Sequence, residues 1–162
     1  MKKQLFLTLV LTLSLVLVQA QKVKVYDETA DAVADIEKAV EMAKKESKHV
    51  MIFIGGNWCP WCLKLNKFIN EDAEIKAALY DNYKVVKMNY SKENKNLPTL
   101  SKLDFPQRFG FPVIVVLDQD GNRIHTQNSA YLEFEKSYDK KKLMGFFGDW
   151  TVGKLDPANY KK

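Results

Sequence analysis

The sequence has few of the residues that bind transition metals. It contains two cysteines and two histidines among 162 residues, whereas a structural zinc site needs four such ligands. His49 and His125 each fall in a predicted strand and lack the paired spacing of zinc motifs. We therefore expect both histidines to be ordinary strand residues and expect no metal site. A zinc site that uses the two cysteines is the alternative.

The sequence also lacks a strong excess of one charge. Lys and Arg number 25 and Asp and Glu number 20, which gives a formal net charge of +5. The basic residues are scattered among acidic ones instead of forming the stripe that is typical of nucleic-acid-binding surfaces. We therefore expect no nucleic-acid partner.

Internal repeats and signs of a second domain are missing too. A chain of this length fits one domain, and a hydrophobic content of 46% is typical of a globular protein. We expect a single domain over residues 21–162, present as a monomer.

Residues 1–20 have the composition of a secretory signal peptide. A basic start at residues 1–3 precedes a nearly apolar run at residues 5–18, and Ala20 supplies the small residue at the cleavage point. The run is shorter than the ~20 residues of a membrane-spanning helix, so an uncleaved anchor is the alternative, and no cysteine at the cleavage point offers a site for a lipid. We expect a periplasmic or secreted protein without stable membrane association after cleavage.

Hydrophobic periodicity predicts alternating helices and strands. Spacings of three and four residues indicate helices, and short β-branched runs indicate strands buried on both faces. The predicted helices cover residues 31–45, 58–70, 73–80, 100–104 and 140–150, and the predicted strands cover residues 49–54, 84–88, 112–117 and 123–126. This order predicts an α/β fold, a sandwich with a mixed parallel/antiparallel central sheet flanked by helices.

Both cysteines stand in one motif, Cys59-Pro60-Trp61-Cys62. A structural disulfide stabilises a protein mainly by closing a long loop in the unfolded chain. Because only two residues separate these cysteines, a bridge between them contributes little stability. The motif follows a buried strand and opens a helix, which is the context of a redox-active pair. The sequence therefore indicates thiol–disulfide chemistry.

The two cysteines are predicted to have different roles. Cys59 lies where strand turns into helix, so its sulfur is expected beside unpaired backbone N–H groups that favour an anion. Such a placement lowers a cysteine pKa from about 8.5 to roughly 3.5–7.5. Pro60 suits the first helical turn, where a backbone N–H is not needed. We predict that Cys59 is the nucleophile and that Cys62 is the resolving thiol, which releases the partner by attacking Cys59.

Two segments resemble the thioredoxin superfamily. The run Trp58–Cys62 follows an apolar strand, and Gly110-Phe111-Pro112 precedes the next one. The resemblance covers about residues 31–150, and the basic end of the leading helix makes the chain similar to exported bacterial thioredoxin-like proteins. It implies a thioredoxin-like sandwich.

The resemblance also implies where substrates bind. It places a cis Pro112 against the cysteines and pairs the backbone of Phe111 with an extended substrate peptide. An X-Pro bond adopts cis at modest cost, and a trans proline that opens a strand is the alternative. The predicted substrate-binding residues are Trp58, Pro60, Trp61, Phe111 and Pro112.

The sequence departs from the thioredoxin pattern at Phe53. Thioredoxins place a buried Asp at this position, where it accepts a proton from the second cysteine. Lys87 matches the lysine that usually pairs with that Asp, and without the Asp we expect it to point outward. Water, Glu71 or Asp72 are candidates to replace the missing base.

Aromatic side chains near the motif have two possible roles. We expect Trp58 to pack near the nucleophile and Trp61 to form an exposed contact surface. Four further aromatics either line a substrate groove or belong to the core, and their density favours the core. They are Phe105, Phe109, Tyr131 and Phe134.

These observations predict a thiol–disulfide oxidoreductase that acts outside the cytoplasm, without a cofactor, on protein or small-molecule disulfides. Its partners would be protein thiols and disulfides and an unidentified redox protein. Oxidase, reductase and isomerase directions stay open, with overall resemblance favouring a reductase or isomerase. The alternative is a redox-inactive chaperone or adaptor with a thioredoxin fold. A peroxidase is less favoured because the Thr and Arg arrangement that it needs is missing from the sequence.

Overall fold

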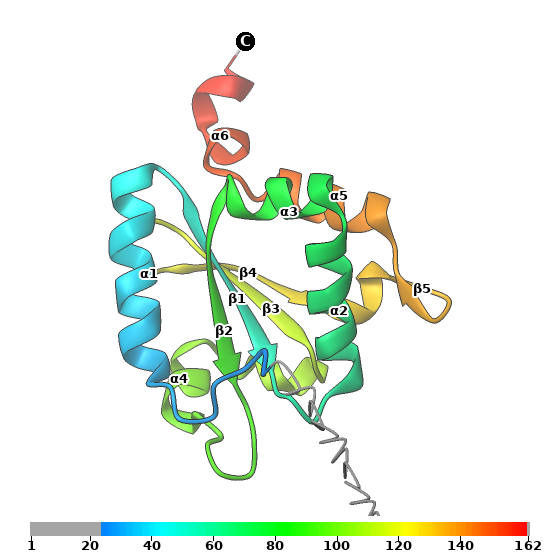
Figure 1. Ribbon diagram of the computed structural model, residues 1–162. Helices are drawn as coiled ribbons and strands as arrows, with labels where there is room; N and C mark the ends of the chain where they lie inside the picture. The colour runs from blue at the N-terminus through cyan, green and yellow to red at the C-terminus, as the bar shows by residue number, and fades with distance from the viewer. Residues whose placement is uncertain (1–23, 162) are drawn as a thin grey trace, which may run out of the picture.

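A four-stranded mixed sheet forms the centre of the fold (Figure 1). The computed structural model describes residues 24–161, so the expected signal peptide at residues 1–20 lies outside the described residues. The strand order is β2-β1-β3-β4, with β1 parallel to β2 and antiparallel to β3, and with β3 antiparallel to β4. The strands are β1 (His49–Gly55), β2 (Tyr83–Asn89), β3 (Val113–Leu117) and β4 (Arg123–Asn128). The predicted mixed α/β sandwich is confirmed.

Helices cover both faces of this sheet. The α-helices are α1 (Ala32–Glu46), α2 (Pro60–Glu71), α3 (Ala73–Tyr80), α4 (Leu97–Lys102), α5 (Lys140–Asp149) and α6 (Val152–Leu155). Side chains of α1 and α4 pack on one face, and side chains of α2, α3 and α5 pack on the other. Figure 1 shows α1 and α2 on opposite sides of the strands.

Alternation along β1 produces these two layers. Successive side chains of a strand point to opposite faces of the sheet. Met51 and Phe53 therefore contact the core under α2, α3 and α5, whereas Val50, Ile52 and Ile54 contact the core under α1 and α4. Every residue of β1 is buried, which explains why its sequence is apolar from Val50 onward.

Short polar side chains set where the helices begin. Asp31, Asp72 and Asp139 precede α1, α3 and α5, and each carboxylate accepts one or two hydrogen bonds from backbone N–H groups of the first turn. Such caps satisfy donors that have no partner inside the helix.

Several short elements differ from the sequence prediction, among them α6, which was not predicted. The short helix expected at residues 100–104 is α4, which begins earlier, at Leu97. A hairpin of β5 (Glu133–Phe134) and β6 (Ser137–Tyr138) was not predicted, because strands of two residues are too short to show a period. Within residues 24–161, no helix combines the length and the apolar character required to cross a membrane.

Candidate active site

Cys59 and Cys62 form a disulfide at the start of α2. Their Cα atoms are 5.2 Å apart. Cys59 is the N-cap residue of α2, and its Sγ accepts a hydrogen bond from the backbone N–H of Cys62 at 3.2 Å. Pro60 is the first helical residue and its side chain is exposed. The sulfur at position 59 therefore lies beside a helix N-terminus, where a negative charge is stabilised.

The end of β1 makes room for the disulfide through Gly55. A Cβ atom placed on Gly55 would lie 2.4 Å from Sγ of Cys62 and 3.1 Å from the hydroxyl oxygen of Tyr26. Real Cβ atoms do not approach other atoms as closely as 2.4 Å. The sulfur and the hydroxyl group therefore both lie against the backbone of this glycine.

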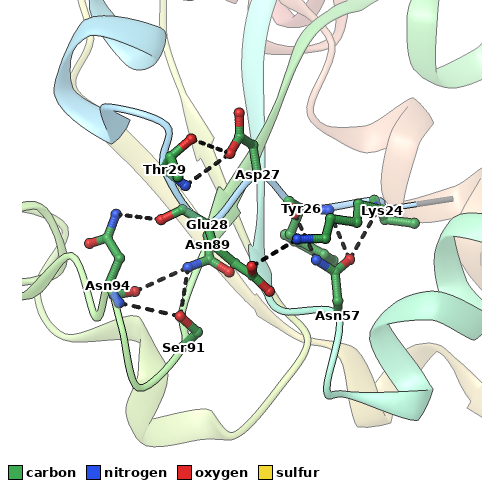
Figure 2. Close-up of polar contacts among 10 residues, drawn as sticks. Lys24, Tyr26, Asp27, Glu28, Thr29, Asn57, Asn89, Ser91 and Asn94 are labelled. Carbon is green, nitrogen blue, oxygen red and sulfur yellow. Dashed lines mark hydrogen bonds and ion pairs between the residues drawn. The ribbon is translucent and has the colours of Figure 1, made fainter. Parts of the chain in front are cut away.

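The segment before α1 packs against the cysteines. Tyr26 is 1% exposed and forms one buried cluster with Cys59 and Cys62. Oδ1 of Asn57 accepts hydrogen bonds from the backbone N–H groups of Val25 and Tyr26 at 3.0 and 3.1 Å, and Nδ2 of Asn57 donates to the carbonyl of Tyr26 at 2.7 Å (Figure 2). Asn57 therefore ties this segment to the turn that carries Cys59.

Sequence reasoning missed Tyr26 and Asn57. They are 31 residues apart along the chain, so no local pattern connects them. The sequence feature that could have indicated a buried segment was the apolar pair Val25-Tyr26, which stands between two charged residues.

The segment that enters β3 carries the expected proline. The Phe111–Pro112 peptide bond is cis, and Pro112 is buried. The ring of Phe111 meets the ring of Trp58 edge-on at 5.6 Å and lies 4.6 Å from that of Tyr90. Nε1 of Trp58 donates to the Tyr90 carbonyl at 2.6 Å. Three aromatic residues from separate segments thus form one surface beside the disulfide.

Of the two tryptophans of the motif, Trp61 is placed differently from the prediction. Trp58 contacts Phe111 but is 55% exposed. Trp61, expected to be exposed, is partly buried against Tyr138, whose hydroxyl donates to the Trp61 carbonyl at 3.2 Å. The cause is the unpredicted β5–β6 hairpin, which brings Tyr138 to α2.

The prediction that four further aromatics belong to the core is wrong. Their exposed fractions range from 40% for Phe109 to 74% for Tyr131. They lie on short helices, at their ends or on the small hairpin, outside the two cores: Phe105, Phe109, Tyr131 and Phe134. Residue density in the sequence did not reveal that these side chains lie outside the two cores.

A cavity of about 550 Å³ lies beside Trp58. Trp58 and Tyr90 supply its aromatic wall, and charged residues of both signs stand at its edge, among them Glu28, Lys92 and Lys95. Its volume falls within the range of about 300–1,000 Å³ that is typical of ligand sites.

Lys87 points into the fold, contrary to the expectation that it would point outward. It pairs with Phe53 in the β1–β2 register, and its Nζ lies 3.7 Å from the centre of the Phe53 ring. Burial lowers the pKa of Lys87 to about 7. The pairing register decides this orientation, because residues opposite each other on neighbouring strands share a face.

The two carboxylates considered as replacements for the missing base lie elsewhere. Cys59 precedes the first residue of α2, whereas Glu71 is its last residue, so the helix rise of ~1.5 Å per residue separates them. Asp72 caps α3 and forms an ion pair with Lys140 at 2.8 Å. Neither carboxylate reaches the sulfur atoms.

The histidines lie at the opposite end of β1 from the cysteines. His49 begins β1, and its Nδ1 makes a hydrogen bond with the Trp150 carbonyl at 2.9 Å. His125 lies on β4 with its ring stacked 4.2 Å from the ring of Trp150. These positions exclude a shared site with Cys59 and Cys62. Within residues 24–161, no three Cys, His, Asp or Glu side chains are grouped to hold a metal ion.

Comparison with known proteins agrees with this geometry. The profile of the family described as Thioredoxin-like matches residues 31–119. The disulfide bond reductase DsbH of Chlamydia pneumoniae is 25% identical over 96 residues, which is 54% of this chain. The chain spans 56% of that relative's length.

Two solved structures share the fold. The disulphide isomerase from Xylella fastidiosa Temecula1 has a TM-score of 0.68 at 27% identity, with 76% of this chain and 94% of that chain covered. The oxidised C-terminal domain of Neisseria meningitidis DsbD has a TM-score of 0.54 at 21% identity, with 74% and 96% covered. The second likeness, at its low identity, concerns the fold alone.

Proposed function

The chain belongs to the thioredoxin-like family, and from this premise we propose that it is a thiol–disulfide oxidoreductase that works through Cys59 and Cys62. The observation that carries the proposal is the position of the Cys59 sulfur at the N-cap of α2, where it accepts the Cys62 N–H. A helix N-terminus stabilises the thiolate form of a cysteine, which is the reactive form.

The reaction has two exchange steps. In the reducing direction, the Cys59 thiolate attacks a substrate disulfide, forms a mixed disulfide and releases one substrate thiol after that sulfur takes up a proton. The Cys62 thiolate then attacks Cys59 Sγ, which forms the Cys59–Cys62 bond and expels the second substrate sulfur with its electron pair. The pair loses two electrons and the substrate gains them. The oxidising direction is the reverse.

The aromatic surface beside the disulfide is the proposed substrate site. Trp58 offers an exposed ring, and the backbone of Phe111 stands before the cis Pro112 next to the pair. Pro60 and Trp61 complete the set from α2. An extended peptide that carries a cysteine fits such a surface through backbone pairing and aromatic contacts.

The site of action and the direction are also part of the proposal. The composition of residues 1–20 supports export to the periplasm or beyond. The names of two relatives, a reductase and an isomerase, support those directions over oxidation. Protein thiols and disulfides are the proposed substrates, and a separate redox protein is the proposed electron partner.

Reduction of insulin disulfides by dithiothreitol tests the proposal. The wild-type protein should accelerate the reaction, and Cys59→Ser should abolish the acceleration while leaving the fold intact by circular dichroism. Ser129→Ala, which changes a buried hydroxyl on another element, controls for substitution itself. Equal rates for wild type and Cys59→Ser would refute the proposal.

Equilibration with glutathione then decides the direction. Potentials in this fold run from about −270 mV for reductants to about −120 mV for oxidants. A value near the first figure agrees with a reductase, and one near the second contradicts it.

The exposed aromatics favour one second candidate, a binding module whose disulfide is not used. That function predicts that a Cys59→Ser/Cys62→Ser variant keeps its partners. A Cys62→Ser variant that accumulates mixed disulfides with protein substrates would contradict it, because trapping requires attack by Cys59.

A further inference from the structure

Thiol exchange places a negative charge on Cys62, and the buried carboxylate that accepts the proton of this cysteine in thioredoxins is missing. Phe53 occupies the position of the expected carboxylate, and Glu71 and Asp72 are remote from the sulfur. Cys62 is 1% exposed, so bulk water solvates its sulfur poorly. A buried thiolate without a hydrogen-bond donor is costly, which means that the protein needs a donor close to this sulfur.

The hydroxyl group of Tyr26 lies close to it. A Cβ atom placed on Gly55 would lie 2.4 Å from the Cys62 sulfur and 3.1 Å from the Tyr26 hydroxyl oxygen. The distance between the sulfur and the oxygen is therefore no greater than the sum of these two distances. Tyr26 and Cys62 share one buried cluster. In this oxidised state the Cys62 sulfur belongs to the disulfide and is only a weak acceptor.

The surrounding contacts hold Tyr26 in this position. Asn57 makes three hydrogen bonds to the backbone of Val25 and Tyr26 (Figure 2). Farther along the same segment, Nδ2 of Asn94 donates to the Glu28 carbonyl at 3.3 Å. A donor that is fixed in advance loses little conformational entropy when it forms its hydrogen bond.

We propose that Tyr26 is the hydrogen-bond donor that stabilises the Cys62 thiolate during disulfide exchange. The proposal rests on the oxidoreductase function proposed above. When an incoming thiolate attacks Cys59, the Cys59–Cys62 bond breaks and its electron pair stays on Cys62. The Tyr26 O–H then donates to that sulfur and keeps its own proton. In the opposite direction, the same hydrogen bond holds Cys62 ionised until it attacks the mixed disulfide.

Tyr26 remains a donor under the conditions of the reaction. Burial raises the pKa of its hydroxyl group, so the group stays protonated at neutral pH. The other ionisable groups around the pair have partners of their own. The Tyr138 hydroxyl donates to the Trp61 carbonyl, the Lys87 Nζ lies on the Phe53 ring, and the Asp27 carboxylate accepts from Thr29.

Titration of Cys62 in a Cys59→Ala background tests the proposal without any activity measurement. The ultraviolet absorbance of the thiolate reports the midpoint of ionisation. Replacing Tyr26 with Phe removes only the hydroxyl, and the loss of a hydrogen bond to a charged group should raise the midpoint by about one pH unit or more, a tenfold change in ionisation. An unchanged midpoint in a folded Tyr26→Phe variant would overturn the proposal.

Tyr83→Phe is the matched control. Tyr83 is also 1% exposed, and its hydroxyl donates to the Phe147 carbonyl at 2.6 Å, in the core and away from the cysteines. Tyr83→Phe should lower the free energy of unfolding without changing the midpoint of Cys62 ionisation. A shift of equal size in both variants would show a general structural effect and contradict a specific role for Tyr26.

A second substitution keeps the test valid if Tyr26→Phe folds poorly. Site-specific 3-fluorotyrosine in place of Tyr26 keeps the ring and the hydroxyl but makes the O–H a stronger donor, so the Cys62 midpoint should fall. No fall would count against the proposal. Failure of the wild-type protein to reduce insulin would instead refute the oxidoreductase function and leave the titration result unaffected.

Discussion

The Nζ atom of Lys87 lies 3.7 Å from the centre of the Phe53 ring, at positions that face each other across the β1–β2 pair. An ammonium group is attracted to an aromatic face, yet burial still lowers the pKa of Lys87 to about 7. The charged form therefore destabilises the folded protein relative to the unfolded chain, where a lysine pKa is about 10.4.

We predict that Lys87→Met stabilises the protein most at low pH. Below pH 7 the lysine is charged in both the folded and the unfolded protein. Burial of the charged ammonium group then lowers the free energy of unfolding by its full amount, of the order of a few kcal/mol. Between pH 7 and about 10.4 the folded state loses its proton first, so wild-type stability rises and the advantage of Lys87→Met shrinks. Urea unfolding of both proteins at several pH values measures this difference in the free energy of unfolding.

The control for that series is Lys84→Met. Lys84 lies on the same strand, but its ammonium group is ion-paired with Glu46, so the substitution removes a charge from the surface instead of from beside the Phe53 ring. An advantage of Lys87→Met that stays constant from pH 6 to pH 10 would contradict the assigned burial.

Gly55→Ala should disturb the disulfide directly. The new Cβ would fall 2.4 Å from Sγ of Cys62, so the sulfur or the backbone must move, at a cost of about 1–3 kcal/mol. We expect a lower denaturant midpoint for the oxidised protein and slower insulin reduction. Gly145→Ala is the matched control, since a Cβ there meets nothing within 4 Å on α5; it should stabilise the helix by about 0.5–1 kcal/mol.

Asn57→Ala should release the segment before α1. It removes three hydrogen bonds between the Asn57 side chain and the backbone of Val25 and Tyr26, with an expected loss of about 1–3 kcal/mol. Hydrogen exchange of the Val25 and Tyr26 amides should accelerate far more than that of β1. Asn70→Ala removes an amide that bonds to Asn66 on an exposed turn of α2 and should leave both backbone amides protected.

Trp58→Ala should weaken the use of protein substrates. The exposed ring packs on Phe111 and lines the adjacent cavity, and an aromatic side chain in such a position often contributes enough to lower kcat/KM about tenfold. Reduction of a small disulfide should change much less, because that substrate needs the two cysteines but little of the aromatic surface. Tyr160→Ala, an exposed aromatic near the end of the described chain, should change neither rate. Equal losses for both substrates would contradict a docking role.

Local patterns explain which elements were predictable. The apolar run of β1 and the helical spacing in α5 are each encoded within a few residues, so their types and order could be read directly. The redox pair is local as well, because Cys59 and Cys62 are three residues apart and open one helix.

Contacts between distant segments explain what was missed. The direction of Lys87 depends on its register with Phe53, and the burial of Trp61 depends on a hairpin that begins 72 residues beyond it. Phe105 and Phe134 are exposed because they lie on or beside short elements, with side chains outside the two cores. None of these contacts produces a repeating pattern in the local sequence.

The sequence by itself determined that this chain is an α/β protein with a dithiol at the start of a helix, because helix periodicity, buried strands and Cys-X-X-Cys spacing are short-range properties. Only the tertiary structure decided what surrounds the sulfur atoms. Tyr26 and Asn57 lie 31 residues apart in the sequence and are in contact there. Hydrogen bonds and close packing between such distant parts of the sequence depend on the path of the folded backbone.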